Sequence, residues 1–393
     1  MRIAIIGAGV VGLSIARELA GRGDDVTVYE AVRPGAGTSS TSFAWVNSHA
    51  KEPLSYHDLN LAGVRAHHAL HAELADGPRW FHPTGNLEWA STPEHEAALK
   101  ASVERLRDRG YAAEWIGADD ARTLEPGARI PDSVTGAVLF PDEGYVLPGE
   151  YLARLLTDAL ARGVRLVCPA PVRAVAADAE GARVTLADGT VETADAVISA
   201  VGRWTEELAA TAGITIPMAD PEGVGSATVG YLAYTEPAPV RLERVLTTSR
   251  LNARPEGGGR LVLQGLDLDA QADPAAPPLG PDSPVARELT ARLAEVMTGG
   301  EHARVAEVRV GRRALPADGL TVCGFADADT HRRLYVVATH SGITLAPALA
   351  EWVTEEVHTA TEVPALADFR PTRFTTESRP TTTLTQVRLP GQQ

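Results

Sequence analysis

The first thirty residues constrain the fold more than any other part of the chain. An apolar run at residues 2–6 leads directly into a glycine-rich turn at residues 7–12 (GAGVVG). Good helix formers occupy residues 13–20, and residues 25–30 have the apolar, β-branched character of a second strand. This order predicts a βαβ unit, and therefore a Rossmann-like parallel sheet with helices on its faces.

The glycines of the turn and one acid fit a bound dinucleotide. Gly7 allows the tight turn, Gly9 lets a pyrophosphate approach the backbone, and Gly12 permits close packing of helix and strand. The free N–H groups and the dipole at the start of the helix favour phosphate. Glu30, at the end of the second strand, is placed to accept hydrogen bonds from ribose hydroxyls. A carboxylate there would also repel a 2′-phosphate, which disfavours NADP.

Two later segments favour FAD over NAD. Residues 35–42 (GAGTSSTS) supply hydroxyls for the far phosphate of a cofactor that lies across the sheet. Residues 196–204 (AVISAVGRW) are similar to the Ala-x-Gly-x-Trp segment that closes over the nucleotide in two-domain flavoproteins. In that setting the backbone of Val172 would lie beside the adenine.

Together these motifs resemble the glycine oxidase, sarcosine oxidase and D-amino-acid oxidase or dehydrogenase family of FAD enzymes, over residues 1 to about 370. Residues 311–319 (GRRALPADG) are similar to the family's Gly-Leu-Arg-Pro segment, and residues 339–347 (THSGITLAP) resemble its C-terminal Gly-His and Leu-Ala-Pro segment. The resemblance implies an oxidoreductase that moves a hydride from the carbon of a C–N bond to flavin N5. The resulting imine would hydrolyse to a 2-oxo acid and an amine.

The resemblance also implies an α/β, glycine-oxidase-like fold with two domains, which agrees with the length of 393 residues. One domain is Rossmann-like and binds FAD; the other is an α+β substrate domain with an antiparallel sheet over about residues 224–264. We expect the FAD domain to comprise residues 1–50, 145–215 and 305–370, the substrate domain 51–144 and 216–304, and a C-terminal tail 371–393. Residues 267–284, rich in Pro, Ala and Asp, are predicted to be a surface loop.

Residue roles follow from the same resemblance. Arg313 aligns with the arginine that grips the substrate carboxylate, and Arg312 is the alternative because Ala314 stands where the family has proline. Gly342 would open a helix whose N-terminus faces flavin O2. His340 contacts the flavin or the substrate, or else fixes its loop.

Further candidates remain open in role. His49 and Lys51 follow a segment that passes the flavin ring in this family; they bear on the substrate, O2 or the flavin edge, or are exposed loop residues. Tyr231 and Tyr234 cannot share one face of a regular strand, so one of them is expected to face the substrate. Gln264 falls near the place where sarcosine oxidases have a lysine that helps O2 react. The electron acceptor is therefore O2 or another molecule.

The predicted catalytic residues are Arg313, His340, His49, Lys51, Tyr231, Tyr234 and Gln264. The predicted cofactor-binding residues are Gly7, Gly9, Val10, Val11, Gly12, Glu30, Gly37, Thr38, Ser39, Ser40, Val172, Ala200, Gly202, Trp204, Arg313, Ser341, Gly342, Ile343 and Thr344. No cysteine falls at the covalent-flavin position of sarcosine oxidases, so non-covalent FAD is expected. No metal site is predicted.

Composition excludes several classes of function. A formal net charge of −15 argues against nucleic-acid binding, and no apolar run approaches the roughly 20 residues of a membrane span. We expect a cytoplasmic protein with a small amino acid or amine as its partner, and leave homo-oligomerisation open.

Three other functions are also compatible with some of these motifs. The first is a biosynthetic tailoring enzyme of the same fold that cleaves a hydrazine-bearing or N-substituted glycine-like amino acid. The second is a flavin-binding electron-transfer subunit with no substrate site of its own. The third is an NAD dehydrogenase.

Overall fold

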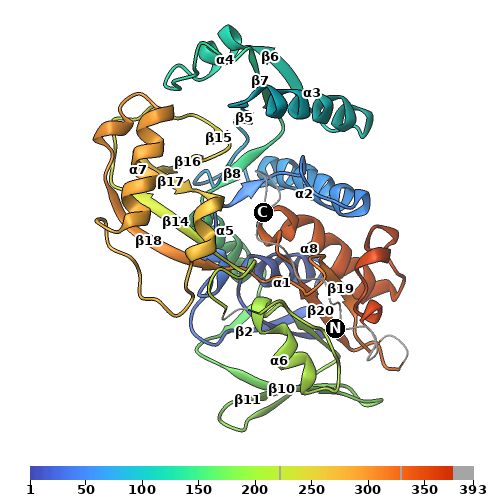
Figure 1. Ribbon diagram of the computed structural model, residues 1–393. Helices are drawn as coiled ribbons and strands as arrows, with labels where there is room; N and C mark the ends of the chain where they lie inside the picture. The colour runs from blue at the N-terminus through green and yellow to red at the C-terminus, as the bar shows by residue number, and fades with distance from the viewer. Residues whose placement is uncertain (221–222, 328–329, 375–393) are drawn as a thin grey trace.

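Both strands of the N-terminal βαβ unit belong to a six-stranded sheet in the order β19-β20-β13-β1-β2-β9 (Figure 1). The computed structural model describes residues 1–220, 223–327 and 330–374. Neighbouring strands of this sheet are parallel except β19, which lies antiparallel to β20 at one edge. The strands are β1 (Arg2–Ile6), β2 (Asp25–Tyr29), β9 (Arg165–Val167), β13 (Ala196–Ser199), β19 (Val322–Phe325) and β20 (Leu334–Ala338).

The two faces of this sheet bury alternate residues of β1, as the two-residue period of a strand requires. Ile3 and Ile5 join the core formed with the helices, whereas Ala4 and Ile6 pack in the cluster of a small antiparallel sheet. The helices are α1 (Val10–Gly21), α2 (Leu54–Glu73), α5 (Pro148–Ala161) and α8 (Gly342–Thr359). The small sheet consists of β10 (Val172–Ala177), β11 (Ala182–Leu186) and β12 (Val191–Ala194), and α6 (Thr205–Ala210) packs beside it.

An eight-stranded sheet forms the other large layer, in the order β18-β14-β17-β16-β15-β5-β7-β6. All neighbours are antiparallel except β15 and β5. The strands are β5 (Asn86–Glu88), β6 (Glu114–Gly117), β7 (Gly136–Phe140), β14 (Val229–Thr235), β15 (Val245–Thr247), β16 (Asn252–Gly257), β17 (Arg260–Gln264) and β18 (Val305–Arg312). Helix α7 (Pro284–Val296) shares their apolar core, and α3 (Pro93–Asp108) and α4 (Ala118–Leu124) lie at the β6 end (Figure 1).

Short elements connect these layers. A three-stranded sheet, β3-β8-β4, consists of β3 (Trp45–Val46), β8 (Gly144–Val146) and β4 (Phe81–His82). The short 3-10 helices are η1 (Thr38–Ser40), η2 (Gly202–Trp204), η3 (Leu266–Gln271), η4 (Gly300–His302), η5 (Pro364–Phe369) and η6 (Pro371–Arg373).

Three predicted segment boundaries fall at or within elements of the structure. Strand β18, which the predicted boundary at residue 305 assigns to the FAD domain, pairs with β14 in the eight-stranded sheet. The predicted surface loop 267–284 begins within η3, where Asp269 is only 6% exposed. The predicted tail at 371–393 begins with η6, whose Pro371 is buried, and its remainder from residue 375 lies outside the described residues. The division into domains stays a prediction.

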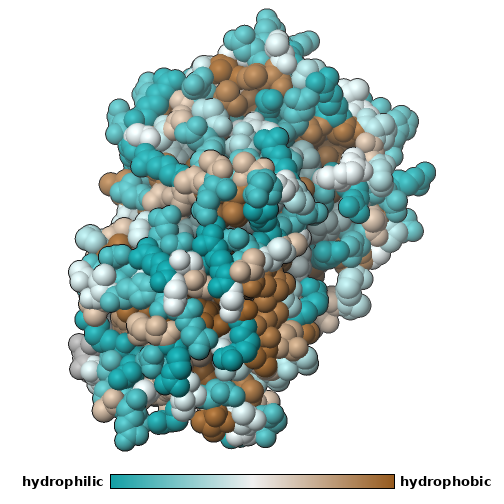
Figure 2. Space-filling view, turned by 180° about the vertical axis from the view of Figure 1, so that it is seen from behind, coloured by the Kyte–Doolittle hydropathy of each residue, from teal (hydrophilic) through white to brown (hydrophobic). Residues whose placement is uncertain are grey.

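Hydrophilic side chains cover most of the face seen in Figure 2, and apolar residues gather in a few areas of it. Large exposed apolar side chains include Val32 and Trp204. Within the described ranges, no helix has both the length and the apolar character needed to cross a bilayer.

Candidate functional site

A cavity of about 860 Å³ opens at the carboxyl ends of the parallel strands. Its wall includes Gly7 after β1, Glu30 after β2, Ala200 after β13 and Thr339 after β20. This edge is where open α/β sheets bind ligands, and the volume lies in the upper part of the usual range for ligand pockets. Further residues of the wall come from the eight-stranded sheet, including Gly230 of β14.

The backbone of the glycine-rich turn lies so close to its neighbours that side chains at the glycine positions would overlap with them. Gly7 has φ +102°, and a Cβ there would lie 2.6 Å from the carbonyl oxygen of Ala200. A Cβ on Gly12 would lie 2.0 Å from the carbonyl oxygen of Gly7, and one on Gly9 3.1 Å from Ser39 Oγ. The turn therefore brings bare backbone and the start of α1 to the cavity, as a pyrophosphate requires.

Two side chains next to this turn are already oriented by the backbone. Glu30 accepts hydrogen bonds from the N–H groups of Ala8 and Val32, both at 2.9 Å, and Ser39 Oγ accepts one from Val10 N at 3.1 Å. Each carboxylate oxygen keeps a second acceptor position, so Glu30 is still able to accept ribose hydroxyls. The cradle, the acid and the hydroxyls together fit the adenine and diphosphate part of FAD.

The nucleotide end of the cavity is bordered by η2. Trp204 is 44% exposed, and the guanidinium of Arg203 lies 3.8 Å from the centroid of its ring. A Cβ on Gly37 would lie 3.5 Å from the Trp204 ring, so the indole lies against this glycine. Val172, at the start of β10, contributes to the same wall.

The other end of the cavity lies at the start of α8. Gly342 is the first residue of this helix, and Ser341 Oγ lies 2.8 Å from the hydroxyl of Tyr56. Thr344 Oγ1 donates to the carbonyl oxygen of Trp45 at 3.2 Å, which ties α8 to the segment that carries β3. The helix N-terminus therefore places its positive dipole end in the cavity wall, together with His340.

Arg313 lies in the wall, and Arg312 does not. The Nη2 of Arg313 is 2.9 Å from Asp269 Oδ2, and the backbone N–H of Arg313 donates to Thr228 at 2.6 Å. Arg312 instead donates from its Nη2 to the carbonyl oxygen of Pro274. Of the two arginines, the structure brings only Arg313 to the cavity.

His49 and Lys51 are not exposed loop residues. They are 8% and 4% exposed, and they lie behind the cavity wall rather than in it. His49 Nδ1 is 2.6 Å from Glu143 Oε1, and its ring stacks on Phe140 at 4.3 Å between centroids. Burial lowers the pKa of His49, but the nearby carboxylates of Glu143 and Glu88 together more than offset this, so the net shift of the pKa is upward.

Tyr231 and Tyr234 lie on opposite faces of β14. Tyr231 packs in the core shared with α7 and donates from its hydroxyl to the carbonyl oxygen of Gln271 at 2.8 Å. Tyr234 packs beside β3 and β8, with the guanidinium of Arg309 4.5 Å from its ring centroid. The part of β14 that lines the cavity is Gly230 and Leu232, and neither tyrosine belongs to that wall.

Gln264 is 2% exposed and lies in the wall at the end of β17. Among the described residues its Oε1 has no hydrogen-bond partner. An unpaired buried amide oxygen is costly, so a ligand donor at this position would be stabilised. Gln264 is therefore available to a substrate or to the flavin edge.

All the predicted cofactor-binding residues except Gly12 and Ser40 lie in the cavity wall. Gly12 acts one layer behind it, through its contact with Gly7. Sequence reasoning missed Asn47 and Asp269 as individual residues. The segment that precedes His49 gave a signal for Asn47, whereas the composition around Asp269 indicates only a surface loop.

Comparison with known proteins agrees with this site. The sequence model of the FAD dependent oxidoreductase (DAO) family matches residues 2–356. Glycine oxidase of Geobacillus kaustophilus is 26% identical over 380 residues, which cover 94% of this chain and 96% of that protein. The 4-methylaminobutanoate oxidase (formaldehyde-forming) of Paenarthrobacter nicotinovorans is 29% identical over 219 residues, 56% of this chain but only 26% of its own length. This chain therefore spans about a quarter of the second relative.

Solved structures give the same fold. The crystal structure of glycine oxidase from Geobacillus kaustophilus superposes with a TM-score of 0.80 at 25% identity and covers 95% of this chain and 99% of that one. L-proline dehydrogenase from P. horikoshii has a TM-score of 0.79 at 20% identity, with 95% and 97% coverage. The second match bears on the fold alone and agrees with the predicted α/β class.

Proposed function

Because the chain belongs to the DAO family of FAD-dependent oxidoreductases, we propose that it oxidises the C–N bond of a small amino acid or N-substituted amino acid. The reaction transfers a hydride from the substrate carbon and leaves an imine, which water hydrolyses to a 2-oxo acid and an amine. When bound, FAD supplies the hydride acceptor at flavin N5. The electrons then pass to O2 or to another acceptor.

One observation carries the proposal: Arg313 lies in the wall of the same cavity as the glycine-rich turn and the start of α8. A guanidinium is able to hold a carboxylate through two parallel hydrogen bonds, which fixes the substrate in position as well as in orientation. Both named relatives act on a molecule that contains an amine and a carboxylate, as their names state.

The remaining residues have roles that follow from their positions. The N-terminus of α8 at Gly342 would stabilise negative charge that develops on the cofactor. Phe43 and Trp45, which are 5% and 6% exposed, would exclude water from the reacting atoms. Gln264 would accept a hydrogen bond from the substrate or the flavin.

The experiment is anaerobic mixing of the FAD-loaded protein with glycine, sarcosine, D-amino acids and L-proline while the visible flavin absorbance is followed. We expect at least one of these compounds to bleach the flavin. Arg313→Ala is expected to lower kcat/KM about 30-fold or more, because truncating one partner of a buried charge pair costs roughly 2–5 kcal/mol. Air and an artificial dye as re-oxidants would then distinguish the acceptors.

Arg312→Ala is the matched control. It removes a guanidinium one position away, whose hydrogen bond goes to the carbonyl oxygen of Pro274 rather than into the cavity. If Arg313→Ala bleached as fast as the wild type while retaining FAD, or if Arg312→Ala were the inactive variant, Arg313 would not be the carboxylate ligand.

A further inference from the structure

The guanidinium of Arg313 is held within the cavity wall by three contacts. Its Nη1 donates to the carbonyl oxygens of Val229 and Ala227, the second at 3.2 Å, and its Nη2 donates to Asp269 Oδ2 at 2.9 Å. A guanidinium has five N–H donors, so these contacts leave Nε–H and one N–H of Nη2. Nε–H and the Nη2 N–H that points the same way form one edge of a guanidinium fork, and such an edge is able to bind one carboxylate in the bidentate manner.

Asp269 is itself fixed on both oxygens. Its Oδ1 accepts the backbone N–H of Tyr231 at 2.9 Å, while Oδ2 faces Arg313. The side chains of Arg313 and Asp269 are 13% and 9% exposed, so the pair is largely removed from water. The charges of Arg313 and Asp269 therefore act on the cavity with little screening by solvent.

Strand β14 leaves room for this ion pair because it has a glycine next to it. A Cβ on Gly230 of β14 would lie 2.5 Å from Arg313 Nη2 and 2.5 Å from Asp269 Oδ2. Gly230 also lines the cavity. The ion pair thus lies against β14 at a residue whose missing side chain gives it room, in the wall of the cavity.

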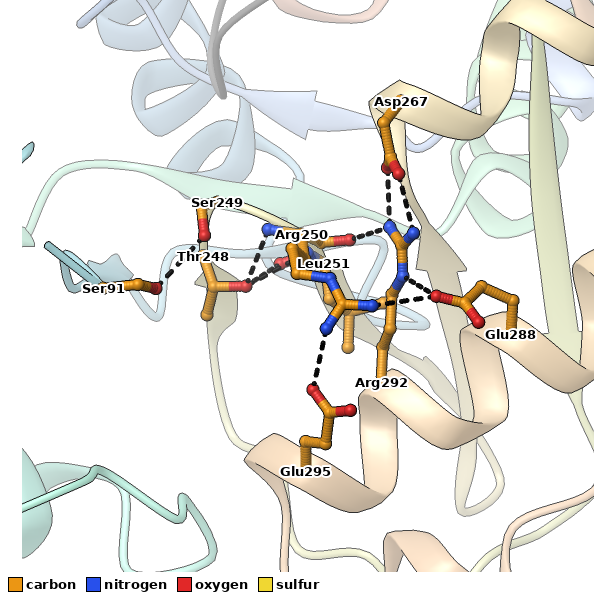
Figure 3. Close-up of polar contacts among 9 residues, drawn as sticks. All are labelled: Ser91, Thr248, Ser249, Arg250, Leu251, Asp267, Glu288, Arg292 and Glu295. Atoms are coloured by element: carbon orange, nitrogen blue, oxygen red, sulfur yellow. Dashed lines mark hydrogen bonds and ion pairs between the residues drawn. The ribbon is translucent and has the colours of Figure 1, made fainter.

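The helix that carries Asp269 is anchored from the other side. Arg292 of α7 donates to both carboxylate oxygens of Asp267, at 2.6 and 2.7 Å, and to Glu288 at 2.8 Å (Figure 3). Arg292 also donates to the carbonyl oxygen of Arg250 at 2.7 Å. Because Asp267 and Asp269 are two residues apart in η3, this contact fixes the backbone from which Asp269 reaches Arg313.

From this geometry we infer that Asp269 is a positioning residue for the substrate carboxylate. It holds the free edge of the Arg313 fork toward the cavity, and its own negative charge weakens the attraction of Arg313 for any carboxylate that binds there. Asp269 thus lowers the affinity of the site for a carboxylate but fixes the bound substrate in a single orientation. This inference rests on the proposed function, because it requires Arg313 to be the carboxylate ligand.

The inference predicts a combination of effects that a purely structural ion pair would not give. In Asp269→Asn the competing charge is gone, so acetate should bind on the order of 10-fold more tightly. Neutral acetamide, which has the same shape, should bind as it does to the wild type. The rate at which an amino-acid substrate bleaches the flavin should fall about 10-fold, because the fork is no longer held in one orientation. Loss of folding alone would weaken acetate binding.

The experiment is titration of the FAD-loaded wild type, Asp269→Asn and Arg313→Ala with acetate and acetamide, read from the change in flavin absorbance. Asp282→Asn, an exposed acid in the same part of the chain, is the control and should match the wild type. If Asp269→Asn does not fold, Asp269→Ser, which also removes the charge, carries the same expectation.

The outcomes separate the two proposals. Unchanged or weaker acetate binding by the Asp269 variant, while Arg313→Ala loses acetate binding, would overturn the role of Asp269 and leave the proposed function intact. An FAD-loaded protein that responds to acetate in none of its forms, or equally with and without Arg313, would overturn both.

Discussion

Replacement of Gly12 by alanine tests whether the close contact between α1 and the glycine-rich turn creates the FAD site. The new Cβ would lie 2.0 Å from the carbonyl oxygen of Gly7, whereas ordinary van der Waals contact begins at 3.4 Å. Helix and turn must therefore separate by about 1.4 Å, the difference between these distances. The Cβ position is fixed by the backbone of residue 12 and its neighbour is a backbone oxygen, so no side-chain rotation relieves the overlap.

A shift of that size breaks hydrogen bonds from the start of α1 to a diphosphate. If two charge-assisted hydrogen bonds are lost at roughly 1.5–3 kcal/mol each, FAD binding weakens by about 3–6 kcal/mol, or roughly 10²–10⁴-fold. Overpacking adds about 1–3 kcal/mol of destabilisation to the fold. The assay is the ratio of visible flavin absorbance to protein absorbance after purification, followed by titration of the apoprotein with FAD.

Gly149→Ala is the matched control for this prediction. Gly149 lies in the first turn of α5, and a Cβ there would have no neighbour within 4 Å. This variant should keep its FAD and gain up to about 1 kcal/mol of stability, because alanine favours helix over glycine. Gly12→Ala with the FAD content and affinity of the wild type would refute the idea that helix packing sets the phosphate site.

Two buried carboxylates give predictions about stability. Burial raises the pKa of Glu88 to about 7 from 4.5, so this group favours folding below about pH 4.5 and loses that contribution as the pH rises to about 7. The stability lost in this pH range is about 3 kcal/mol. The urea midpoint of the wild type should therefore fall more steeply between pH 5 and 8 than that of Glu88→Gln. Parallel pH profiles of the two proteins would contradict the raised pKa of Glu88. Glu356 is 1% exposed, binds Arg370 through both oxygens at 2.6 and 2.7 Å, and accepts the Tyr335 hydroxyl at 2.7 Å. Glu356→Gln should cost about 3–5 kcal/mol in urea unfolding, whereas exposed Glu355→Gln should change stability by less than about 1 kcal/mol; equal effects would show that the buried charge is not needed.

The sequence by itself determined the βαβ unit and the glycine-rich turn. The βαβ unit, the glycine positions and Glu30 are local features, because a turn, a helix start and the end of a strand lie within thirty residues of one another. Their backbone conformations require particular residue types; a φ of +102° at Gly7, for example, favours glycine. The placement of this motif at the carboxyl edge of a parallel sheet follows from the same local order.

The part of the cavity wall that comes from the eight-stranded sheet was decided by tertiary structure. Tyr231 and Tyr234 are in a predicted strand, but the register of β14 against β17 and β18 determines that Gly230 and Leu232 line the cavity instead. Asp269 is in a segment whose composition indicates a surface loop, but the structure buries it between the N–H of Tyr231 and the guanidinium of Arg313. Contacts between residues far apart in sequence depend on strand order and on how charges are paired after burial. A single sequence carries no local signal for either.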